Sequence, residues 1–216
     1  LIQQGAPMER IKAQCRKNFH LLMADGEYDE LSDGRKSMIA RWVKDGGILM
    51  GINRAAVWAE SLCFEHPQDK CETEEAATAN GSPVPARAYS DFADDKARQV
   101  IGGAIVGSTL DLSHPLAFGY QRSELPIFRR GTTLLTPSDN AYSTPVRYTS
   151  NPLLAGFIGQ ERLEAFRGGP AVIAEKTGEG LVVRFANTPV FRGFWRGTER
   201  LFINALYFGQ VIESTE

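Results

Sequence analysis

The feature that most constrains the fold is an apolar run that passes directly into a helix-forming segment. Residues 48–52 (ILMGI) carry no charge and predict a buried strand. Residues 54–62 (RAAVWAESL) follow at once and contain helix-forming residues without glycine or proline. A strand that turns sharply into a helix, with one polar residue at the turn, is the geometry of a nucleophile elbow. That residue is Asn53 here, between Gly51 and Arg54 in the sequence.

The segments around this turn favour an α/β fold. Residues 19–24 form another short apolar run, and residues 33–44 place apolar side chains on one face of a predicted helix. Strand, helix, strand and helix in quick succession predict a mainly parallel sheet flanked by helices.

The C-terminal third predicts an antiparallel hairpin and a last helix. Residues 170–176 and 181–186 are strand-like and enclose a turn with two glycines. Residues 199–209 form an amphipathic segment that Thr198 can cap. The other predicted elements are a helix over 91–100, a strand over 103–112 and an irregular or β-rich stretch over 113–150.

Length and composition predict a single domain over residues 1–216, with a solvated loop insertion at about 64–88. The net charge of −2 gives no general reason to expect nucleic acid as a partner. No apolar run approaches the roughly 18 residues of a membrane helix, so no membrane span is expected. The chain begins at Leu1 without a signal-like segment, and we expect it to be a processed form or a piece of a longer protein.

Two segments resemble the class I glutamine amidotransferase-like fold. GINRAAV, at 51–57, is similar to the G-I-C-R-G-x-Q elbow of that family, with Asn53 in the place of the cysteine nucleophile. In the family, the last strand runs into an H-P-E that supplies the general base, and here Thr188-Pro189-Val190 stands in that place. An amide nitrogen is no nucleophile, and threonine and valine cannot act as the base. The resemblance therefore implies a degenerate site without amidase activity.

A more specific resemblance is to the amidotransferase-like domain at the C-terminal end of some bacterial zinc carboxypeptidase-related proteins. It rests on four segments in order, at 42–49, 111–120, 151–156 and 191–207. The resemblance implies a three-layer, flavodoxin-like sandwich and a non-catalytic accessory domain that packs against, or presents substrate to, a carboxypeptidase-like domain of the same polypeptide. It also implies export, which would favour a Cys63–Cys71 disulfide over two reduced thiols.

Two other functions stay open from the residues alone. Asn53, Arg54, His114 and Arg192 could line a pocket for a small molecule or an anion beyond the strand ends. An anion site could also gather Arg184, Arg192, Arg196 and Arg200. The alternative for Arg192 is a contact with a sheet-edge carbonyl or with an internal acid such as Asp25 or Glu60.

The third function is a hydrolase with a site rebuilt around Ser113-His114 or Asp25. The alternative for His114 is a structural role, in which the imidazole bonds the backbone and fixes the turn at Pro115. The three histidines show no metal-binding spacing, so no metal and no cofactor are expected.

Overall fold

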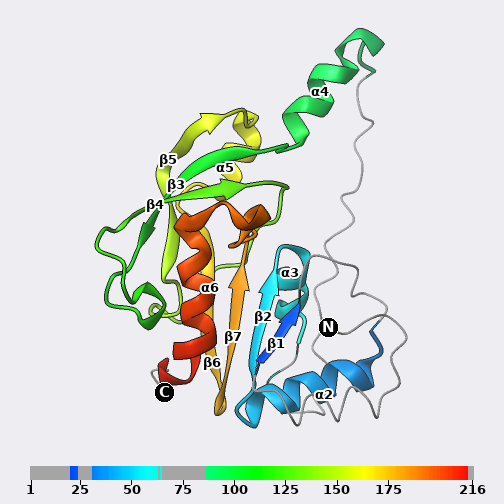
Figure 1. The fold of residues 1–216 in the computed structure, drawn as a ribbon. Helices are drawn as coiled ribbons and strands as arrows, with labels where there is room; N and C mark the ends of the chain where they lie inside the picture. The colour runs from blue at the N-terminus through cyan, green and yellow to red at the C-terminus, as the bar shows by residue number, and fades with distance from the viewer. Residues whose placement is uncertain (1–19, 24–30, 63, 65–85, 214–216) are drawn as a thin grey trace.

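The computed structural model describes residues 20–23, 31–62, 64 and 86–213. They form a seven-stranded mixed sheet with helices on both faces (Figure 1), in the strand order β1-β2-β7-β6-β5-β3-β4. The strands are β1 (His20–Met23), β2 (Ile48–Ile52), β3 (Ala104–Leu110), β4 (Glu124–Arg129), β5 (Val146–Gly156), β6 (Pro170–Thr177) and β7 (Gly180–Phe185). The helices are α2 (Asp33–Lys44), α3 (Arg54–Glu60), α4 (Phe92–Gln99), α5 (Gln160–Phe166) and α6 (Arg196–Phe208), with 3-10 turns η1 (Tyr89–Asp91), η2 (Pro115–Ala117), η3 (Phe191–Gly193) and η4 (Gly209–Val211).

The sheet divides into two regions that differ in strand direction. In the parallel region, β1, β2 and β7 run side by side in the same direction. In the antiparallel region, β3, β4, β5 and β6 each run opposite to their neighbours. The hairpin of β6 and β7, which the sequence predicted, joins the two regions.

The expectation of a mainly parallel sheet is wrong. Only the pairs β1–β2 and β2–β7 are parallel, and the other four neighbouring pairs are antiparallel. Parallel neighbours need a crossover connection, usually a helix. Between β3 and β5 the chain forms only η2 and β4, and β4 and β5 pair antiparallel with opposite edges of β3.

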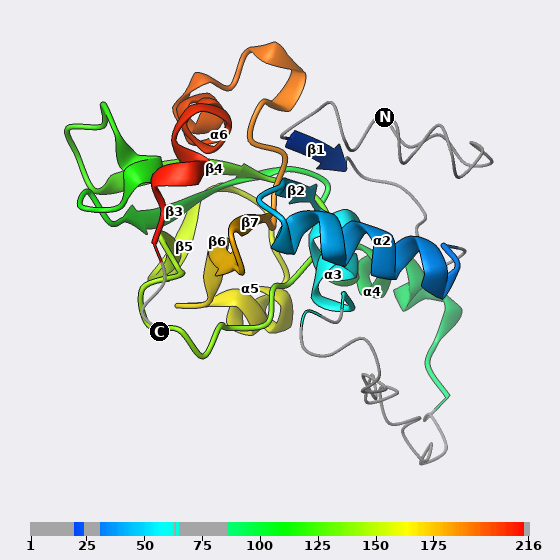
Figure 2. The ribbon, with the colours of Figure 1, turned by 90° about the horizontal axis from the view of Figure 1, so that it is seen from below.

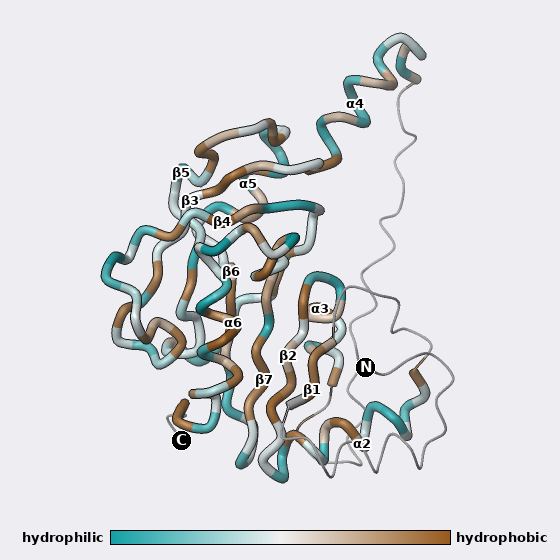
Figure 3. Tube along the Cα trace, in the orientation of Figure 1, coloured by the Kyte–Doolittle hydropathy of each residue, from teal (hydrophilic) through white to brown (hydrophobic). Residues whose placement is uncertain are grey.

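Helices cover both faces of the parallel region, as Figure 2 shows. The side chains of β2 alternate: Ile48 and Met50 belong to the core beneath α6, whereas Leu49 belongs to the core beneath α2 and α3. All five residues of β2 are buried, and Figure 3 shows the apolar traces of β1, β2 and β7 side by side. A strand with two buried faces reads as a continuous apolar run, which is why the sequence revealed it.

The predicted helices form, with one correction at the last. α2 begins after Ser32, and α3 and α4 lie inside their predicted ranges. The last helix begins at Arg196, so Thr198 lies within its first turn and does not cap it. The Thr198 hydroxyl donates instead to the carbonyl of Pro189, at 2.6 Å.

Some predictions fall on residues outside the described ranges. They include most of the loop insertion at 64–88, Asp25 and all three cysteines, and thus the Cys63–Cys71 disulfide. Among the described residues, no helix has both the length and the apolar character that crossing a bilayer requires.

Candidate functional site

The candidate site lies at the sharp turn between β2 and α3. Asn53 has φ 54° and ψ −120°, and its N–H donates to the carbonyl of Phe185 on the neighbouring strand β7 at 2.9 Å. A positive φ of this kind is unusual outside glycine and costs about 1–3 kcal/mol, so the surrounding structure must enforce it. The sharp turn that the sequence predicted at this position is confirmed.

Gly51 allows the helix to approach the strand at this turn. A Cβ on Gly51 would lie 2.8 Å from the carbonyl oxygen of Ala55 and 2.9 Å from the Cα of Ala56. Both atoms belong to the backbone of α3 and cannot move aside without shifting the helix. The close contact of β2 and α3 therefore requires glycine here, which explains the G-x-N order of the elbow.

The side chain of Asn53 meets Thr188, which follows the end of β7. Asn53 Nδ2 donates to Thr188 Oγ1 at 3.1 Å. The two residues are 135 positions apart in the sequence, and they meet because β2 and β7 are parallel neighbours, with Ile52 opposite Phe185. Asn53 Oδ1 is buried and has no hydrogen-bond partner among the described residues. The Asn53–Thr188 hydrogen bond joins the two positions that the sequence resemblance compares with the nucleophile and the base.

The other residues of the predicted site do not complete it. Arg54 is the first residue of α3 and is exposed, and Val190 is half-buried at the start of η3. Arg192 is exposed with φ 51°, and its guanidinium lies 5.3 Å from the ring centre of Phe191. Among the described residues, neither Arg192 nor His114 is hydrogen-bonded to Asn53.

The four arginines do not converge on an anion niche. Arg184 is buried and forms ion pairs with Glu60 and Glu175, each at 2.6 Å. Arg196 pairs with Glu199 on its own helix, and Arg200 donates to the carbonyl of Gly119. Glu60 pairs with Arg184, so the alternative that paired Arg192 with Glu60 is wrong.

The loop at Ser113-His114 has the geometry of a structural turn. Ser113 Oγ donates to Asp111 Oδ1 at 2.6 Å, so its hydroxyl proton is directed away from the histidine. His114 Nδ1 accepts from the N–H of Leu116 at 3.1 Å, which fixes the turn at Pro115. Burial lowers the pKa of His114, and nearby Asp111 opposes this only in part. The structural alternative for His114 is confirmed.

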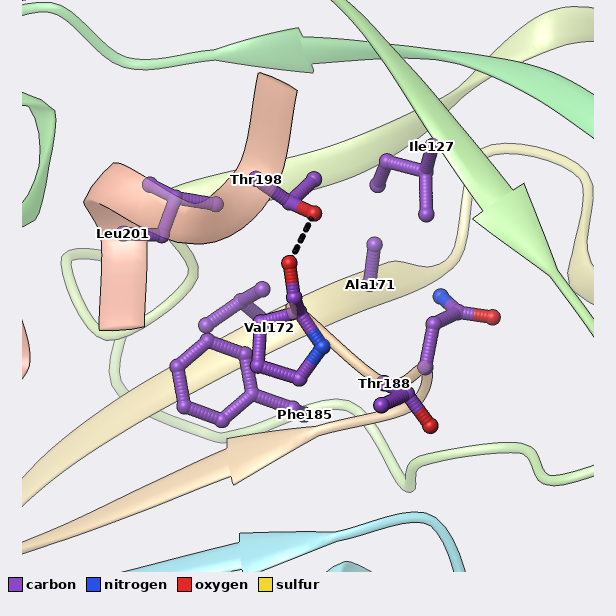
Figure 4. Close-up of a pocket in the computed structure, with 9 residues that line it drawn as sticks. Ile127, Ala171, Val172, Phe185, Thr188, Thr198 and Leu201 are labelled. Carbon is purple, nitrogen blue, oxygen red and sulfur yellow. Dashed lines mark hydrogen bonds between the residues drawn. The ribbon is translucent and has the colours of Figure 1, made fainter. Parts of the chain in front are cut away.

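A small pocket lies on the α6 side of the strand ends (Figure 4). Its space of about 10 Å³ is close to what a single water molecule requires. Figure 4 shows the Thr198 hydroxyl bonded to the Pro189 carbonyl and the Thr188 hydroxyl directed away from the space. The lining is mostly apolar, with Ile127, Ala171, Val172, Phe185, Pro189 and Leu201 among its residues. This pocket is too small for a substrate.

A buried polar cluster behind the strand ends escaped the sequence predictions. Arg129 is 1% exposed and donates to Tyr148 Oη at 2.7 Å, Asn187 Oδ1 at 3.3 Å and the carbonyl of Thr133 at 2.7 Å. Its guanidinium also lies 4.3 Å from the ring centre of Phe166. Burial raises the pKa of Tyr148. The sequence signal that could have revealed Arg129 is the period of two along β4. It places Leu125, Ile127 and Arg129 on one face of the strand.

Comparisons with known proteins add little to this geometry. No family model and no curated protein matches the chain. Among solved structures, the chain is similar to the cytoplasmic protein STM3548 from Salmonella typhimurium, at 14% identity and a TM-score of 0.45, over 95% of this chain and 76% of that one. Within the described residues, no group of three or more histidine, cysteine, aspartate or glutamate side chains could hold a metal ion. The site is therefore interpreted from its own geometry.

Proposed function

We propose that this chain is an amidotransferase-like domain without amidase activity that serves as an accessory domain of a zinc carboxypeptidase-related protein. The observation that supports this most directly is the backbone of Asn53, which keeps a strained elbow conformation although its side chain is an amide. Strain of this kind is typical of functional sites. An elbow without a nucleophile is what the resemblance to the amidotransferase-like family implies.

The chemistry around Asn53 supports an inert site. The amide nitrogen donates a hydrogen bond to Thr188 Oγ1, and its lone pair is delocalised into the carbonyl. A threonine hydroxyl cannot accept the proton that a thiol or water nucleophile must lose, and Val190 has no polar atom.

A packing role is favoured over a binding pocket by the small size of the pocket at the strand ends. The pocket beside Thr188 has room for about one water molecule, and the arginines proposed for an anion site are directed to separate partners. The proposal assigns the parallel region, with α2 and α3 on one face and α6 on the other, to a flavodoxin-like three-layer sandwich. Export of the chain and the Cys63–Cys71 disulfide belong to the same proposal.

The loop between β7 and α6 is the best surface for the carboxypeptidase-like domain. Its sequence, RGFWRG at 192–197, is rich in the arginine and aromatic residues that dominate interface hot spots. Phe194 is 60% exposed, and its ring packs edge-on against Phe191 and Trp195. Phe191 in turn stacks on Phe128 with ring centres 4.1 Å apart. The exposed ring is therefore held by a rigid aromatic cluster and could enter a pocket of the partner domain.

The inert elbow is tested by assaying hydrolysis of glutamine and of a generic ester. We expect ammonia and alcohol release by the chain to equal that of the Asn53→Ala and His114→Ala variants. Turnover that disappears in either variant would overturn the proposal. A positive control is Asn53→Cys combined with Thr188→His: we expect iodoacetamide to label the new thiol faster than the thiol of Val57→Cys, an exposed position on α3.

The partner is tested through the region of the gene that precedes the codon for Leu1. We expect it to encode a signal peptide and a carboxypeptidase-like module with an H-x-x-E motif and a distant histidine. Produced as two separate chains, the module and this domain should co-elute in size-exclusion chromatography, and Phe194→Ala should weaken the complex. An unrelated upstream region would overturn the accessory role. The inert elbow would still be tested separately by the hydrolysis assay.

A further inference from the structure

The backbone at Asn53 holds its Cβ beside the nitrogen of the next residue. The ψ of −120° lies outside both the helical and the extended regions that an L residue normally occupies. Around the tetrahedral Cα of an L residue, the torsion Cβ–Cα–C–N is larger than ψ by about 120°. Adding this difference to the ψ of −120° leaves a torsion of about 0° at Asn53. The Cβ of Asn53 is therefore eclipsed with the nitrogen of Arg54.

This eclipsed torsion is the one that a five-membered ring between the two residues requires. A succinimide forms when the Cγ of an asparagine bonds to the main-chain nitrogen of the following residue, and its ring is planar when Cβ and that nitrogen are eclipsed. An ordinary chain must leave the helical or extended region to reach this arrangement, which costs strain energy. The fold already holds Asn53 there, so only rotation about the Cα–Cβ bond remains to bring Cγ to the nitrogen.

The carboxamide of Asn53 can react as an electrophile, although its nitrogen is no nucleophile. The atom that must leave on ring closure is Nδ2, which donates to Thr188 Oγ1 at 3.1 Å. A hydroxyl group both donates and accepts, so the hydroxyl of Thr188 can rotate to donate to this nitrogen once it becomes basic in the tetrahedral intermediate. The leaving group thus has a suitable neighbour in the folded chain.

We propose that Asn53 is a site of covalent modification, where its side chain cyclises with the main-chain nitrogen of Arg54 to a succinimide. Hydroxide takes the N–H proton of Arg54, the nitrogen bonds to Cγ, and the Cγ–Nδ2 bond then breaks. The departing nitrogen takes a proton from water and leaves as ammonia, which restores the hydroxide. Each chain reacts once and releases one ammonia, so this modification is distinct from turnover of glutamine and does not depend on the proposed accessory role.

The product is compatible with the hydrogen bonds around the turn. The N–H groups of the first helical turn have no partner within the helix, and a substituted nitrogen, like that of proline, is favoured at the first helical position. The main-chain carbonyl of Asn53 stays in the ring and can still accept from the N–H of Ala56, at 3.0 Å. Because Asn53 Oδ1 is buried, we expect water to reach the ring slowly and the imide to persist in the folded chain.

Mass spectrometry of the folded chain, incubated at mildly alkaline pH, tests the proposal. We expect the mass to fall by one ammonia and peptide mapping to place the loss at Asn53. The rate at Asn53 should be at least about tenfold higher in the folded chain than in guanidinium chloride, where ψ is no longer held. In the unfolded chain Asn80, which glycine follows in the sequence, shows that the conditions permit cyclisation. An unreacted Asn53 under these conditions, or equal rates in both states, would overturn the proposal.

Two controls separate the backbone geometry from the chemistry of an amide. Asn204 lies within α6, where a helical ψ near −42° turns Cβ well away from the next nitrogen, so it should keep its ammonia. Asn53→Gln moves the carbonyl one carbon farther and requires a six-membered ring, so this variant should keep its ammonia as well. Its circular dichroism spectrum checks that it folds. A loss from Asn204 as fast as from Asn53, or an unchanged loss in Asn53→Gln, would contradict the proposal.

Hydroxylamine distinguishes the imide from direct hydrolysis of the amide. It attacks the carbonyl carbons of a succinimide, so treatment of the incubated chain after unfolding should yield fragments 1–53 and 54–216. Direct hydrolysis would instead give an aspartate, with a higher mass than asparagine and no cleavage at this position. An aspartate formed at position 53 without a hydroxylamine-sensitive precursor would rule out the cyclisation.

Discussion

The parallel and the antiparallel regions of the sheet each bury one arginine, but the two charges are accommodated differently. Arg184 on β7 lies between the carboxylates of Glu60 and Glu175, whose side chains are 21% and 30% exposed. Arg129 on β4 is bonded to a phenol, an amide and a backbone carbonyl, and its guanidinium lies against the ring of Phe166. The first is an ion-pair network at the border with solvent, whereas the second is a buried cation among neutral groups.

This difference shows how each region is stabilised. In the parallel region, Arg184 connects α3, β7 and β6, and Glu60 also accepts from the N–H and the hydroxyl of Thr136. In the antiparallel region, Arg129 connects β4 and β5 with the loop after β7 through neutral acceptors. Removing the cation therefore leaves unpaired carboxylates in one region and only neutral polar groups in the other.

The largest effect is expected for Arg184→Met. The loss of a buried partner from an ion pair costs about 3–5 kcal/mol, and because Glu60 and Glu175 are partly hydrated we expect about 2–4 kcal/mol less unfolding free energy. Urea denaturation measures it. The control is Arg147→Met, an exposed position on β5, with an expected change within about 0.5 kcal/mol. If Arg184→Met lost no more unfolding free energy than the control, the ion-pair network would not stabilise the parallel region.

A smaller loss is expected for Arg129→Met. Its three hydrogen bonds disappear and leave neutral partners unsatisfied, but a buried charge disappears as well, so we expect about 1–3 kcal/mol. The same urea titration measures it. If Arg129→Met were more destabilising than Arg184→Met, the contrast between the two regions would be reversed, and Arg129 would need a counter-charge outside the described residues.

The strain of the elbow is measured by comparing two variants of Asn53. Both Asn53→Ala and Asn53→Gly lose the hydrogen bond to Thr188, but glycine adopts the positive φ without strain. We expect Asn53→Gly to be more stable than Asn53→Ala by about 1–2 kcal/mol in thermal or urea unfolding. Equal stability of the two variants would contradict a strained turn. Thr188→Val is the matched control, since it removes the hydrogen bond without changing the backbone at position 53.

The smallest expected effect on stability comes from the ionisation of two tyrosines and is confined to alkaline solution. Burial raises the pKa of Tyr120 from 10.0 to about 12 and also raises that of Tyr148. Above pH 10 the folded state keeps phenolic protons that the unfolded state loses. The unfolding free energy is therefore constant with respect to these tyrosines below pH 10 and falls between pH 10 and 12. The slope is at most about 1.4 kcal/mol per pH unit for each tyrosine. Urea titrations at several pH values measure the slope. It should flatten in Tyr120→Phe and persist in Tyr207→Phe, and an unchanged slope in Tyr120→Phe would contradict the assignment.

The sequence predicted the parallel region better than the antiparallel region for a physical reason. A strand with two buried faces, such as β2, appears as an uninterrupted apolar run, and the amphipathic pattern of α2 is equally local. In contrast, β4 has one exposed face and β5 pairs with β3 through irregular registers, so their sequences alternate and contain proline. The alternation along β4 places Arg129 on the same face as Leu125 and Ile127, but nothing local showed that β4 and β5 would pair with opposite edges of β3.

Residue chemistry alone established what the elbow lacks, because an amide at position 53 is no nucleophile and a hydroxyl at 188 is no general base in any fold. Their meeting depends on β7 lying beside β2, a pairing of distant segments that no local pattern encodes. Tertiary packing likewise decided that Glu60 binds Arg184 and that the pocket beside Thr188 has space for about one water molecule. The partners of a long side chain and the volume of a cavity are settled only when segments far apart in sequence come together.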